Sequence, residues 1–207
     1  MTQPTYSYQP KQGHGLAHDP LNAIIAPRPI GWISSRSAAG QRNLAPYSFF
    51  NLFNYHPPII GFASSGWKDS VANIAETKEF VWNLVTHPLA SAMNQTSAPL
   101  PHGQDEFSLA GLTAIRSELI AVDRVAESPV HFECQLTQLI QLRDSQDQPI
   151  DSWLVLGEVV MIHIDASLLD SQGIYQTVDA SPILRAGGPS AYYGISEEQR
   201  MDLWRPQ

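Results

Sequence analysis

The stretch Pro27–Asn51, PRPIGWISSRSAAGQRNLAPYSFFN, contains the features that decide the fold. It opens with an apolar run that combines β-branched and aromatic residues, Ile30–Ile33. A turn of small and polar residues follows at Ser37–Gln41, and then a segment, NLAPYSFFN, that is rich in hydrogen-bonding groups of little bulk. This order is typical of a strand, a tight turn and a returning strand. The strands expected here are Ile30–Ser35 and Tyr47–Phe50.

A second stretch, SSGWKDS at Ser64–Ser70, follows about twenty residues later. Its small residues let backbone N–H groups approach a phosphate, and a helix that starts near Ser70 directs its positive end to the same place. Lys68 adds a full charge, and the serine hydroxyls add donors. Taken alone, the stretch is more often an ordinary loop before a capped helix. Ser48, on the returning strand opposite, favours a binding site.

Length and composition set limits on the remaining possibilities. A chain of 207 residues suits one substantial domain. Only 15% of its residues are charged and 43% are apolar, so we expect a second subunit or a large ligand to cover part of the surface. With 12 basic against 20 acidic residues, the net charge of −8 argues against binding to nucleic acid or to an anionic membrane.

Other absences in the sequence narrow the class further. No run reaches the ~18 apolar residues of a membrane span, and the first residues lack the pattern of a signal peptide. The single cysteine, Cys134, excludes an internal disulfide and a cysteine-rich metal site. These features predict a cytoplasmic protein.

The rest of the chain alternates short strands, turns and small helices. Residues 1–20 lack periodicity and predict an N-terminal arm, in which His14 and His18 are expected to form a solvated pair and not a metal site. The further strands expected are Ile59–Ser64, Phe80–Val85, Val130–Leu136 and Trp153–Ile164. The helices expected are Val71–Thr77 capped by Asp69 or Ser70, Pro88–Gln95, Asp105–Leu112 and one after Ser196. Several strands joined by short turns are typical of a closed or partly open β-barrel.

The strand at Val130–Leu136 alternates in a regular way. Val130, Phe132, Cys134 and Leu136 are expected to point inward, and His131, Glu133 and Gln135 outward. Cys134 is then a buried small apolar residue, with a reactive thiol the less common alternative. His163 is expected, like His131, to face solvent or an interface. Gly157 predicts a bulge or the close approach of another backbone.

Several familiar catalytic patterns are missing. The run GFASSG has its glycine one position away from G-x-S-x-G, which disfavours a hydrolase, and neither a P-loop nor G-x-G-x-x-G occurs. No metal-ligand spacing is present, so we expect no metal. Trp32 and Tyr47 can stack on a planar ring, although aromatic residues on strands more often lie in the core. The residues alone therefore predict a pocket for a phosphate and a ring, on a β-barrel.

Several segments in order resemble the flavin reductase-like family, the FMN-binding split-barrel flavoproteins. They are PRPIGWISS, NLAPYSFFN, PPIIGFASS with KDSVANI, EFVWNLV, the later GEVV with HID, and RAGG with the tyrosines after it. The resemblance runs from about residue 20 to residue 193. It implies a mainly β fold, a six-stranded Greek-key split barrel with short peripheral helices, over residues 21–207. It also implies a homodimer with FMN near the subunit interface.

The resemblance implies positions for the cofactor. Residues 43–48 lie along the flavin ring and ribityl chain, and Ser48, Lys68, Asp69 and Ser70 fall where the family binds ribityl and phosphate. Many relatives have threonine at position 70, and serine keeps the hydroxyl. The cofactor-binding residues expected in total are Trp32, Ser34, Asn43, Ala45, Pro46, Tyr47, Ser48, Ser64, Lys68, Asp69 and Ser70.

The function implied is that of an FMN-binding flavoprotein oxidoreductase, either an NAD(P)H-dependent flavin reductase or a reductase or oxygenase component. Because the flavin supplies the redox chemistry, no catalytic residue of the protein is assigned. Two alternatives stay open: an FMN-binding electron-transfer protein without NAD(P)H activity, and a structural domain without FMN. The arm and the loop around Ser97–Gln104 are expected to control access for a second substrate.

Overall fold

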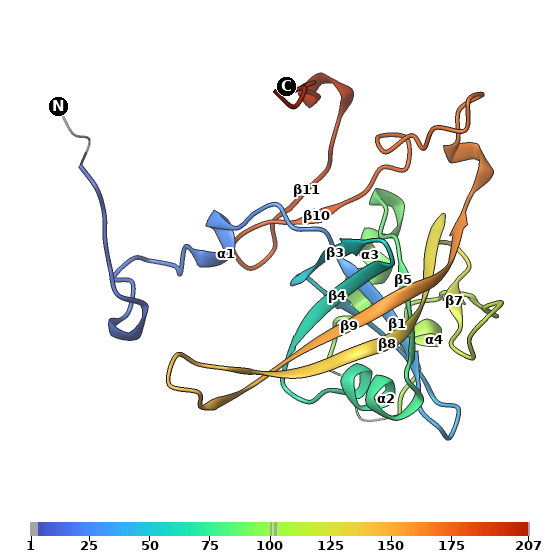
Figure 1. Ribbon diagram of the computed structural model, residues 1–207, viewed down its shortest axis with the longest axis horizontal. Coiled ribbons are helices and arrows are strands. Elements are labelled where there is room, and N and C mark those ends of the chain that lie inside the picture. The colour runs from blue at the N-terminus through green and yellow to red at the C-terminus, as the bar shows by residue number, and fades with distance from the viewer. Residues whose placement is uncertain (1–3, 100, 102, 207) are drawn as a thin grey trace.

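One bent segment, residues 42–55, closes the sheet into a barrel. Its first half is β2 (Arg42–Tyr47), which pairs with β1 (Gly31–Arg36), and its second half is β3 (Phe50–Tyr55), which pairs with β4 (Pro58–Ser65). In this computed structural model, which describes residues 4–99, 101 and 103–206, the main sheet has the strand order β2-β1-β5-β8-β9-β4-β3. Because β2 and β3 stand at its two ends but adjoin in the chain, the sheet curls back on itself (Figure 1).

The other elements are short except for one long hairpin. The remaining strands of the main sheet are β5 (Glu79–Asn83), β8 (Val130–Arg143) and β9 (Pro149–Ile164). Two-stranded pairs form from β6 (Ala114–Ile115) with β7 (Arg124–Val125), and from β10 (Leu184–Arg185) with β11 (Tyr192–Tyr193). The α-helices are α1 (Leu21–Ile24), α2 (Asp69–Thr77), α3 (Ala90–Gln95) and α4 (Glu106–Leu109). Single 3-10 turns are η1 (Pro10–Gln12), η2 (His87–Leu89), η3 (Ala166–Leu168) and η4 (Glu197–Gln199). In the described part of the chain, none of the helices is long and apolar enough to cross a membrane.

The predicted fold class, a mainly β barrel with short peripheral helices, is confirmed. The described sheet has seven strands and not six, because the bent segment is interrupted at Ser48 and Phe49. The prediction of a strand at Tyr47–Phe50 was wrong. That strand begins earlier, at Arg42, and residues 48 and 49 form the corner before β3, which was not predicted.

Two apolar cores lie on opposite sides of β1 and β2. Inside the barrel, Ile33, Tyr47, Phe62 and Phe80 pack with other buried residues. On the other side, side chains of β1 and β2 pack against side chains of α3, α4 and nearby residues and form a second core. It includes Trp32, Leu44, Val85, Met93 and Phe107. Side chains on a strand alternate between its faces, so neighbouring residues of β1 serve different cores. The two faces of β1 and β2 are therefore both buried.

Helix α2 covers one end of the barrel. Val71 and Ile74 are fully buried against the barrel core. The N-cap is Lys68, one residue before the expected cap, and the helix begins at Asp69. Its nine residues end at Thr77, and the left-handed backbone of the C-cap, Lys78 (φ 66°), closes the last turn. The start of this helix consequently lies beside β2.

A segment that we name the strap, residues 116–123, covers the outer face of β5 and β8. Its Ile120 and Val122 pack against Val81 of β5. Glu133 of β8 accepts hydrogen bonds from the backbone N–H groups of Glu118 and Leu119, at 2.8 Å each. In addition, the side chain of Glu79 accepts from the backbone N–H of Ala121 at 2.8 Å. Carboxylates on the barrel therefore hold the strap in place.

The strap overturns part of the predicted alternation of β8. Val130 and Cys134 point inward as expected, but His131 and Glu133 are not outward in solvent: they are 5% and 0% exposed. His131 donates Nε2–H to the carbonyl oxygen of Val125 at 2.7 Å, and burial lowers its pKa to about 4. Burial raises the pKa of Glu133, but the N–H groups of the strap and His163 outweigh that effect, and the net pKa is lowered.

Arg28 links the segment before β1 and the segment after β10 to the corner of the barrel at Ser48. Its guanidinium donates to the carbonyl oxygens of Asn22, Ile25, Ser48 and Ala186. Residues 4–20 extend away from the barrel, as does the tip of the β8–β9 hairpin (Figure 1). The corner at Ser48 is thus fixed by a cation from the segment that leads into β1.

The close packing of Gly157 on β9 gives a test of the barrel core. A Cβ atom there would lie 2.3 Å from Cε1 of Phe80 and 3.2 Å from the carbonyl oxygen of Gln135. We expect Gly157→Ala to lower the free energy of unfolding by about 1–3 kcal/mol, because a packed core resists added volume. Urea unfolding measures this change. Gly194→Ala is the control, since a Cβ atom at Gly194 meets nothing within 4 Å; equal effects for both would contradict the packing.

Candidate cofactor site

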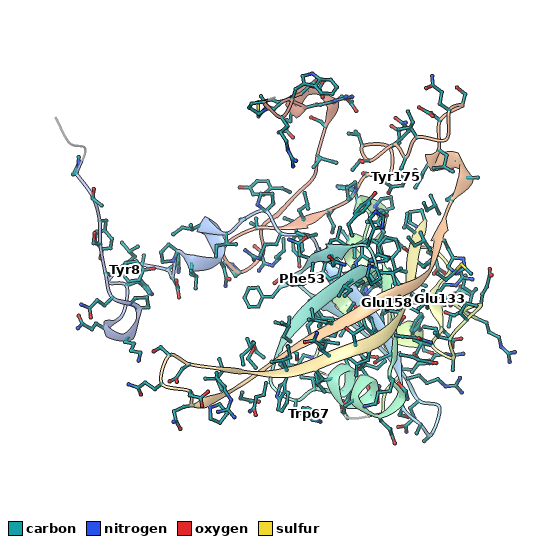
Figure 2. The ribbon with its side chains drawn as sticks, in the orientation of Figure 1. Tyr8, Phe53, Trp67, Glu133, Glu158 and Tyr175 are labelled. Carbon is teal, nitrogen blue, oxygen red and sulfur yellow. The ribbon has the colours of Figure 1, made fainter. Side chains whose placement is uncertain are left out.

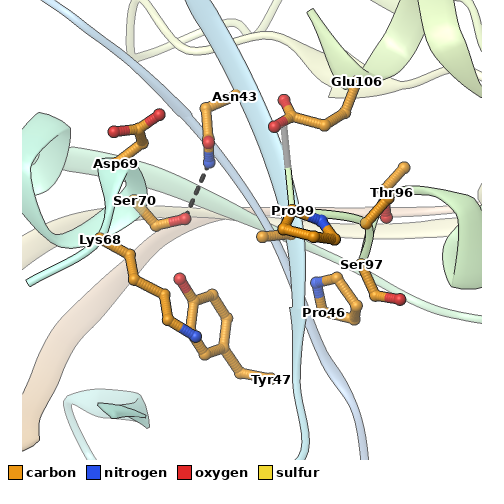
Figure 3. Close-up of a pocket in the computed structure, with 12 residues that line it drawn as sticks. Asn43, Pro46, Tyr47, Lys68, Asp69, Ser70, Thr96, Ser97, Pro99 and Glu106 are labelled. Atoms are coloured by element: carbon orange, nitrogen blue, oxygen red, sulfur yellow. Dashed lines mark hydrogen bonds between the residues drawn. The ribbon is translucent and has the colours of Figure 1, made fainter. Parts of the chain in front are cut away.

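A pocket of about 430 Å³ opens beside β2, between the start of α2 and the loop that follows α3 (Figure 3). The residues that line it come from four separate segments of the chain. They are Asn43, Ala45, Pro46, Tyr47, Lys68, Asp69, Ser70, Thr96, Ser97, Ala98, Pro99 and Glu106. Strand β2 therefore forms the wall that the other three segments face.

A hydrogen-bond network fixes the polar side chains at the α2 end of the pocket. The amide of Asn43 donates to Oγ of Ser70 at 2.8 Å (Figure 3) and to Oγ of Ser35 at 3.3 Å. Asn73, one turn into α2, donates to the same Ser35 oxygen at 3.2 Å. Ser70 is only 1% exposed. The first turn of α2 is thereby held in a fixed position against β1 and β2.

Tyr47 belongs to the same network. Burial raises the pKa of its phenol, while hydrogen bonds to Ser70 and Ser64 act in the opposite direction. The raised pKa keeps the side chain a neutral hydroxyl at physiological pH, so it can still donate a hydrogen bond. Ser64 is fully buried and donates to the carbonyl oxygen of Gly66 at 2.9 Å, which stabilises the loop before α2.

Charge is unevenly distributed in the pocket. Lys68 is exposed at the N-cap of α2, where the backbone N–H groups of the first turn add partial positive charge. Glu106 lies across the pocket from it (Figure 3). The carboxylate of Asp69 also lines this end of the pocket, beside Ser70 (Figure 3). A ligand that carries an anionic group at one end therefore matches Lys68 and the backbone N–H groups, and not the side of Asp69.

Glu106 was not predicted as a site residue. It is 8% exposed, and its Oε2 accepts the backbone N–H of Leu44 at 2.9 Å. It is the first residue of α4, after the N-cap Asp105. Acidic residues are common in the first turn of any helix, so nothing in the sequence distinguished this one. Its carboxylate fixes the edge of β2 where that strand enters the pocket.

Several predicted residues lie outside the pocket lining. Trp32 is fully buried in the second core, and its Nε1–H donates to Oγ1 of Thr96 at 3.0 Å, so it supports the wall from behind. Ser34 donates to the carbonyl oxygen of Asp123 at 2.7 Å, on the outer face of β1. Ser48 lies at the corner, with its carbonyl oxygen bonded to Arg28. The structure does not bring these side chains together with Lys68.

The loop after α3 supplies the remaining wall. Thr96 is buried, and Ser97, Ala98 and Pro99 line the pocket from the exposed side. Residues 100 and 102 of the predicted access loop lie outside the described residues. Among the described residues, no three His, Cys, Asp or Glu side chains are placed so that they could hold a metal ion.

Comparison with known proteins decides the family. The sequence pattern of the flavin reductase like domain matches residues 25–180, from the end of α1 to beyond η3. The chain belongs to the flavin reductase-like family. The match includes β2, the start of α2, the loop after α3 and α4, which are the segments that line the pocket.

Individual relatives agree with this assignment. An uncharacterised protein of Aquifex aeolicus is 35% identical over 170 residues, which cover 80% of this chain and 83% of the relative. The crystal structure of component B of nitrilotriacetate monooxygenase from Bacillus cereus superimposes with a TM-score of 0.88 at 32% identity, covering 98% of this chain and 100% of that one. The 2-nitrobenzoate 2-nitroreductase of Pseudomonas fluorescens gives a TM-score of 0.77 at 29% identity, over 90% and 88% of the two chains.

The buried carboxyl of Glu106 predicts a pH dependence of stability. Burial raises its pKa, and the hydrogen bond from Leu44 lowers it by less. A carboxyl with a raised pKa in the folded state destabilises the protein above that pKa, and the penalty fades as the pH falls towards the ordinary glutamate value of about 4.3. We therefore expect Glu106→Gln, which keeps an acceptor for Leu44, to raise the free energy of unfolding at pH 7 and to have little effect near pH 4.

Chemical unfolding at a series of pH values measures this difference. Glu127→Gln is the matched control, because the exposed Glu127 carboxylate also accepts a backbone N–H, that of Thr113. A Glu106→Gln variant that is less stable than the wild type at pH 7 would show that the ionised carboxylate is favourable there.

Proposed function

We propose that this protein is an FMN-binding flavoprotein oxidoreductase and that the pocket beside β2 holds FMN. The observation that carries the proposal is the fixed first turn of α2. It places a cation, Lys68, and a buried hydroxyl, Ser70, at one end of a pocket whose other walls are strand edge and loop. A helix start with an added lysine is a suitable site for a phosphate.

The donor set fits the phosphate end of the cofactor. Lys68 contributes charge, and the first backbone N–H groups of α2 point to the same place. Ser70 already accepts a hydrogen bond from Asn43, so its hydroxyl hydrogen is left for Tyr47 or for a phosphate oxygen. These groups would hold the phosphate, and the family resemblance favours the same assignment.

The other end of the pocket suits a planar ring. It is lined by Ala45 and Pro46 of β2 and by Ser97, Ala98 and Pro99 of the loop after α3. Their flat or small surfaces exclude water without blocking a ring system. In this proposal the ring and ribityl chain of FMN follow residues 43–47.

Bound FMN would supply hydride and electron transfer, and the protein residues bind, orient and shield it. Lys68 and Ser70 fix one end, Asn43 and Tyr47 keep that end rigid, and the loop at Ser97–Pro99 controls what reaches the ring. Solved relatives are named as a monooxygenase component and a nitroreductase, which favours an enzyme over a structural domain. An electron-transfer protein with the same cofactor is the second candidate.

We propose in addition that two copies of the chain associate through an apolar surface at the corner of the barrel. At the end of α1, Ile24 and the C-cap residue Ile25 are 70% and 61% exposed, and on β3 the side chains of Phe53 and Tyr55 are 56% and 72% exposed. Figure 2 shows Phe53 pointing away from the barrel. Exposed apolar side chains gathered in this way are typical of an interface.

The role of Lys68 can be tested by binding. A charge-assisted hydrogen bond contributes about 1.5–3 kcal/mol, which is roughly 10- to 150-fold in affinity. We expect Lys68→Ala to weaken FMN binding by about that factor and to leave riboflavin binding almost unchanged. Fluorescence titration with both flavins measures it, with Lys78→Gln at the far end of α2 as control. Equal losses for both flavins would contradict a contact with the phosphate.

Anaerobic stopped-flow absorbance separates the reductase from the electron carrier. The pocket is open to solvent at the loop Ser97–Pro99, so a nicotinamide has access to the ring. We expect NADH or NADPH to bleach bound FMN within seconds. Reduction by dithionite, but by neither nucleotide, would instead identify a carrier.

The proposed interface gives a further prediction. Phe53→Glu places a charge in a surface that association would bury, at a penalty of several kcal/mol. We expect the dissociation constant of the dimer to rise roughly 100-fold or more, measured by light scattering across a range of protein concentrations. Phe53 lies outside the pocket lining, so FMN should still bind. A wild-type protein that is monomeric at micromolar concentration would contradict the interface.

A further inference from the structure

A second cavity, of about 310 Å³, lies on the outer face of β1, where the strap passes over the end of that strand. Its lining is mostly polar and includes two arginines. The residues are Arg36, Arg116, Ser117, Ile120, Ala121 and Asp123. No part of the proposed FMN site contributes to it.

The faces of β1 and β2 keep the two sites apart. Ser35 points toward Asn43 and Asn73, on the side of α2. Arg36, the next residue, points to the opposite face, as Ser34 does. The arginine cavity and the Lys68 pocket are therefore on opposite sides of this part of the sheet.

Most donors of the two guanidinium groups have no acceptor among the residues that the structure describes. Arg36 is half-buried, and Nη1 makes its one described hydrogen bond, to the carbonyl oxygen of Ala121 at 3.3 Å. A guanidinium carries five N–H donors. The side chain of Arg116 makes no hydrogen bond or ion pair with any described residue. Arg36 is therefore a partly desolvated cation, which an anion stabilises, and the exposed Arg116 beside it has its donors available for the same anion.

The carboxylate in the cavity is already engaged. Asp123 accepts from Nε of Arg42 at 2.6 Å, and its side chain is 12% exposed. This ion pair neutralises Asp123 and leaves Arg36 and Arg116 with a net positive charge. The cavity is thus a local basic site in a protein whose net charge is −8.

The backbone that carries the two arginines is fixed in advance. Arg124 donates from Nε and Nη2 to the carbonyl oxygen of Arg116, at 3.3 and 3.0 Å. Oγ of Ser117 donates to the carbonyl oxygen of Val122 at 2.5 Å, which closes the strap on itself. The turn at Gly40 packs against Arg36, since a Cβ atom there would lie 2.9 Å from Nη2. A ligand would not have to order these segments on binding.

We propose that this cavity binds a phosphate group, either the free ion or a monoester, through Arg36 and Arg116. Guanidinium groups match the geometry of phosphate oxygens, and two of them balance a dianion. The cavity is larger than a single phosphate needs, so it has space for a small substituent on the ester. The phosphate can be the free ion or the monoester of a nucleotide, and both carry the chemistry that the arginines recognise.

Isothermal titration calorimetry of the FMN-saturated protein tests the proposal, with inorganic phosphate and adenosine 2′,5′-bisphosphate as probes. Low ionic strength is required, because at 0.01 M the Debye length is about 30 Å. Four variants are compared: Arg36→Gln, Arg116→Gln, Arg143→Gln and Lys68→Ala. Arg143, on the β8–β9 hairpin, is exposed and paired with Asp147 at 3.5 Å, and serves as the matched control.

We expect saturable binding that Arg36→Gln and Arg116→Gln each weaken by about 10- to 100-fold, with little change in the other two variants. Arg116 is exposed, so its replacement does not endanger the fold. Tighter binding of the bisphosphate would identify a nucleotide ligand, and equal binding the free ion; both support the site. Absence of saturable binding, or an equal loss in Arg143→Gln, would overturn it. Loss in Lys68→Ala alone would assign the phosphate to the FMN pocket instead.

Discussion

The pairing of one bent segment with two different strands is the constraint on which the rest of the structure depends. Residues 42–47 pair with β1 and residues 50–55 with β4, so a single continuous piece of chain joins both ends of the sheet. The same segment forms the wall of the pocket, and its bend is held by Arg28. The segment that closes the barrel is therefore also the segment that shapes the candidate binding site.

Local pattern was sufficient where the partner of a strand lies nearby in the chain. The apolar run before the turn and the small loop before α2 predicted β1 and the start of the helix, because turn chemistry and capping act over a few residues. The corner at Ser48 was not predictable in this way, because it depends on contacts between distant parts of the chain. Ser48 accepts a hydrogen bond from Arg28, and Arg28 also donates to Ala186, 158 residues away in the sequence. The burial of Glu133 depends in the same way on the strap, which contacts β8 in the fold but leaves no signal in the alternation of that strand.

The candidate site shows the same division. Lys68 and Ser70 were predicted from a loop and helix start that are continuous in sequence, and Asn43 and Tyr47 from the hairpin and the family resemblance; the structure places all four around one pocket. Glu106 and Thr96 line the pocket only because tertiary packing brings them there. A single acidic or hydroxyl residue in the sequence does not indicate that it will lie in a pocket. For Trp32 the strand was predicted correctly, but the position of the side chain was not. Both faces of β1 are buried, and the alternation of residues along a strand does not show which face lines a ligand pocket.

The way the strap is held has a consequence for how this protein can vary in sequence. Glu133 and Glu79 accept hydrogen bonds from the backbone of residues 118, 119 and 121, so the strap provides N–H groups that every residue except proline possesses. These hydrogen bonds need a carboxylate at positions 79 and 133 of the barrel. They do not depend on the side chains at positions 118, 119 and 121, because only the backbone of those residues takes part. Substitutions can therefore accumulate at Glu118, Leu119 and Ala121 while the path of the chain over the barrel stays the same, which lets the outer surface diverge between relatives without disturbing the sheet beneath.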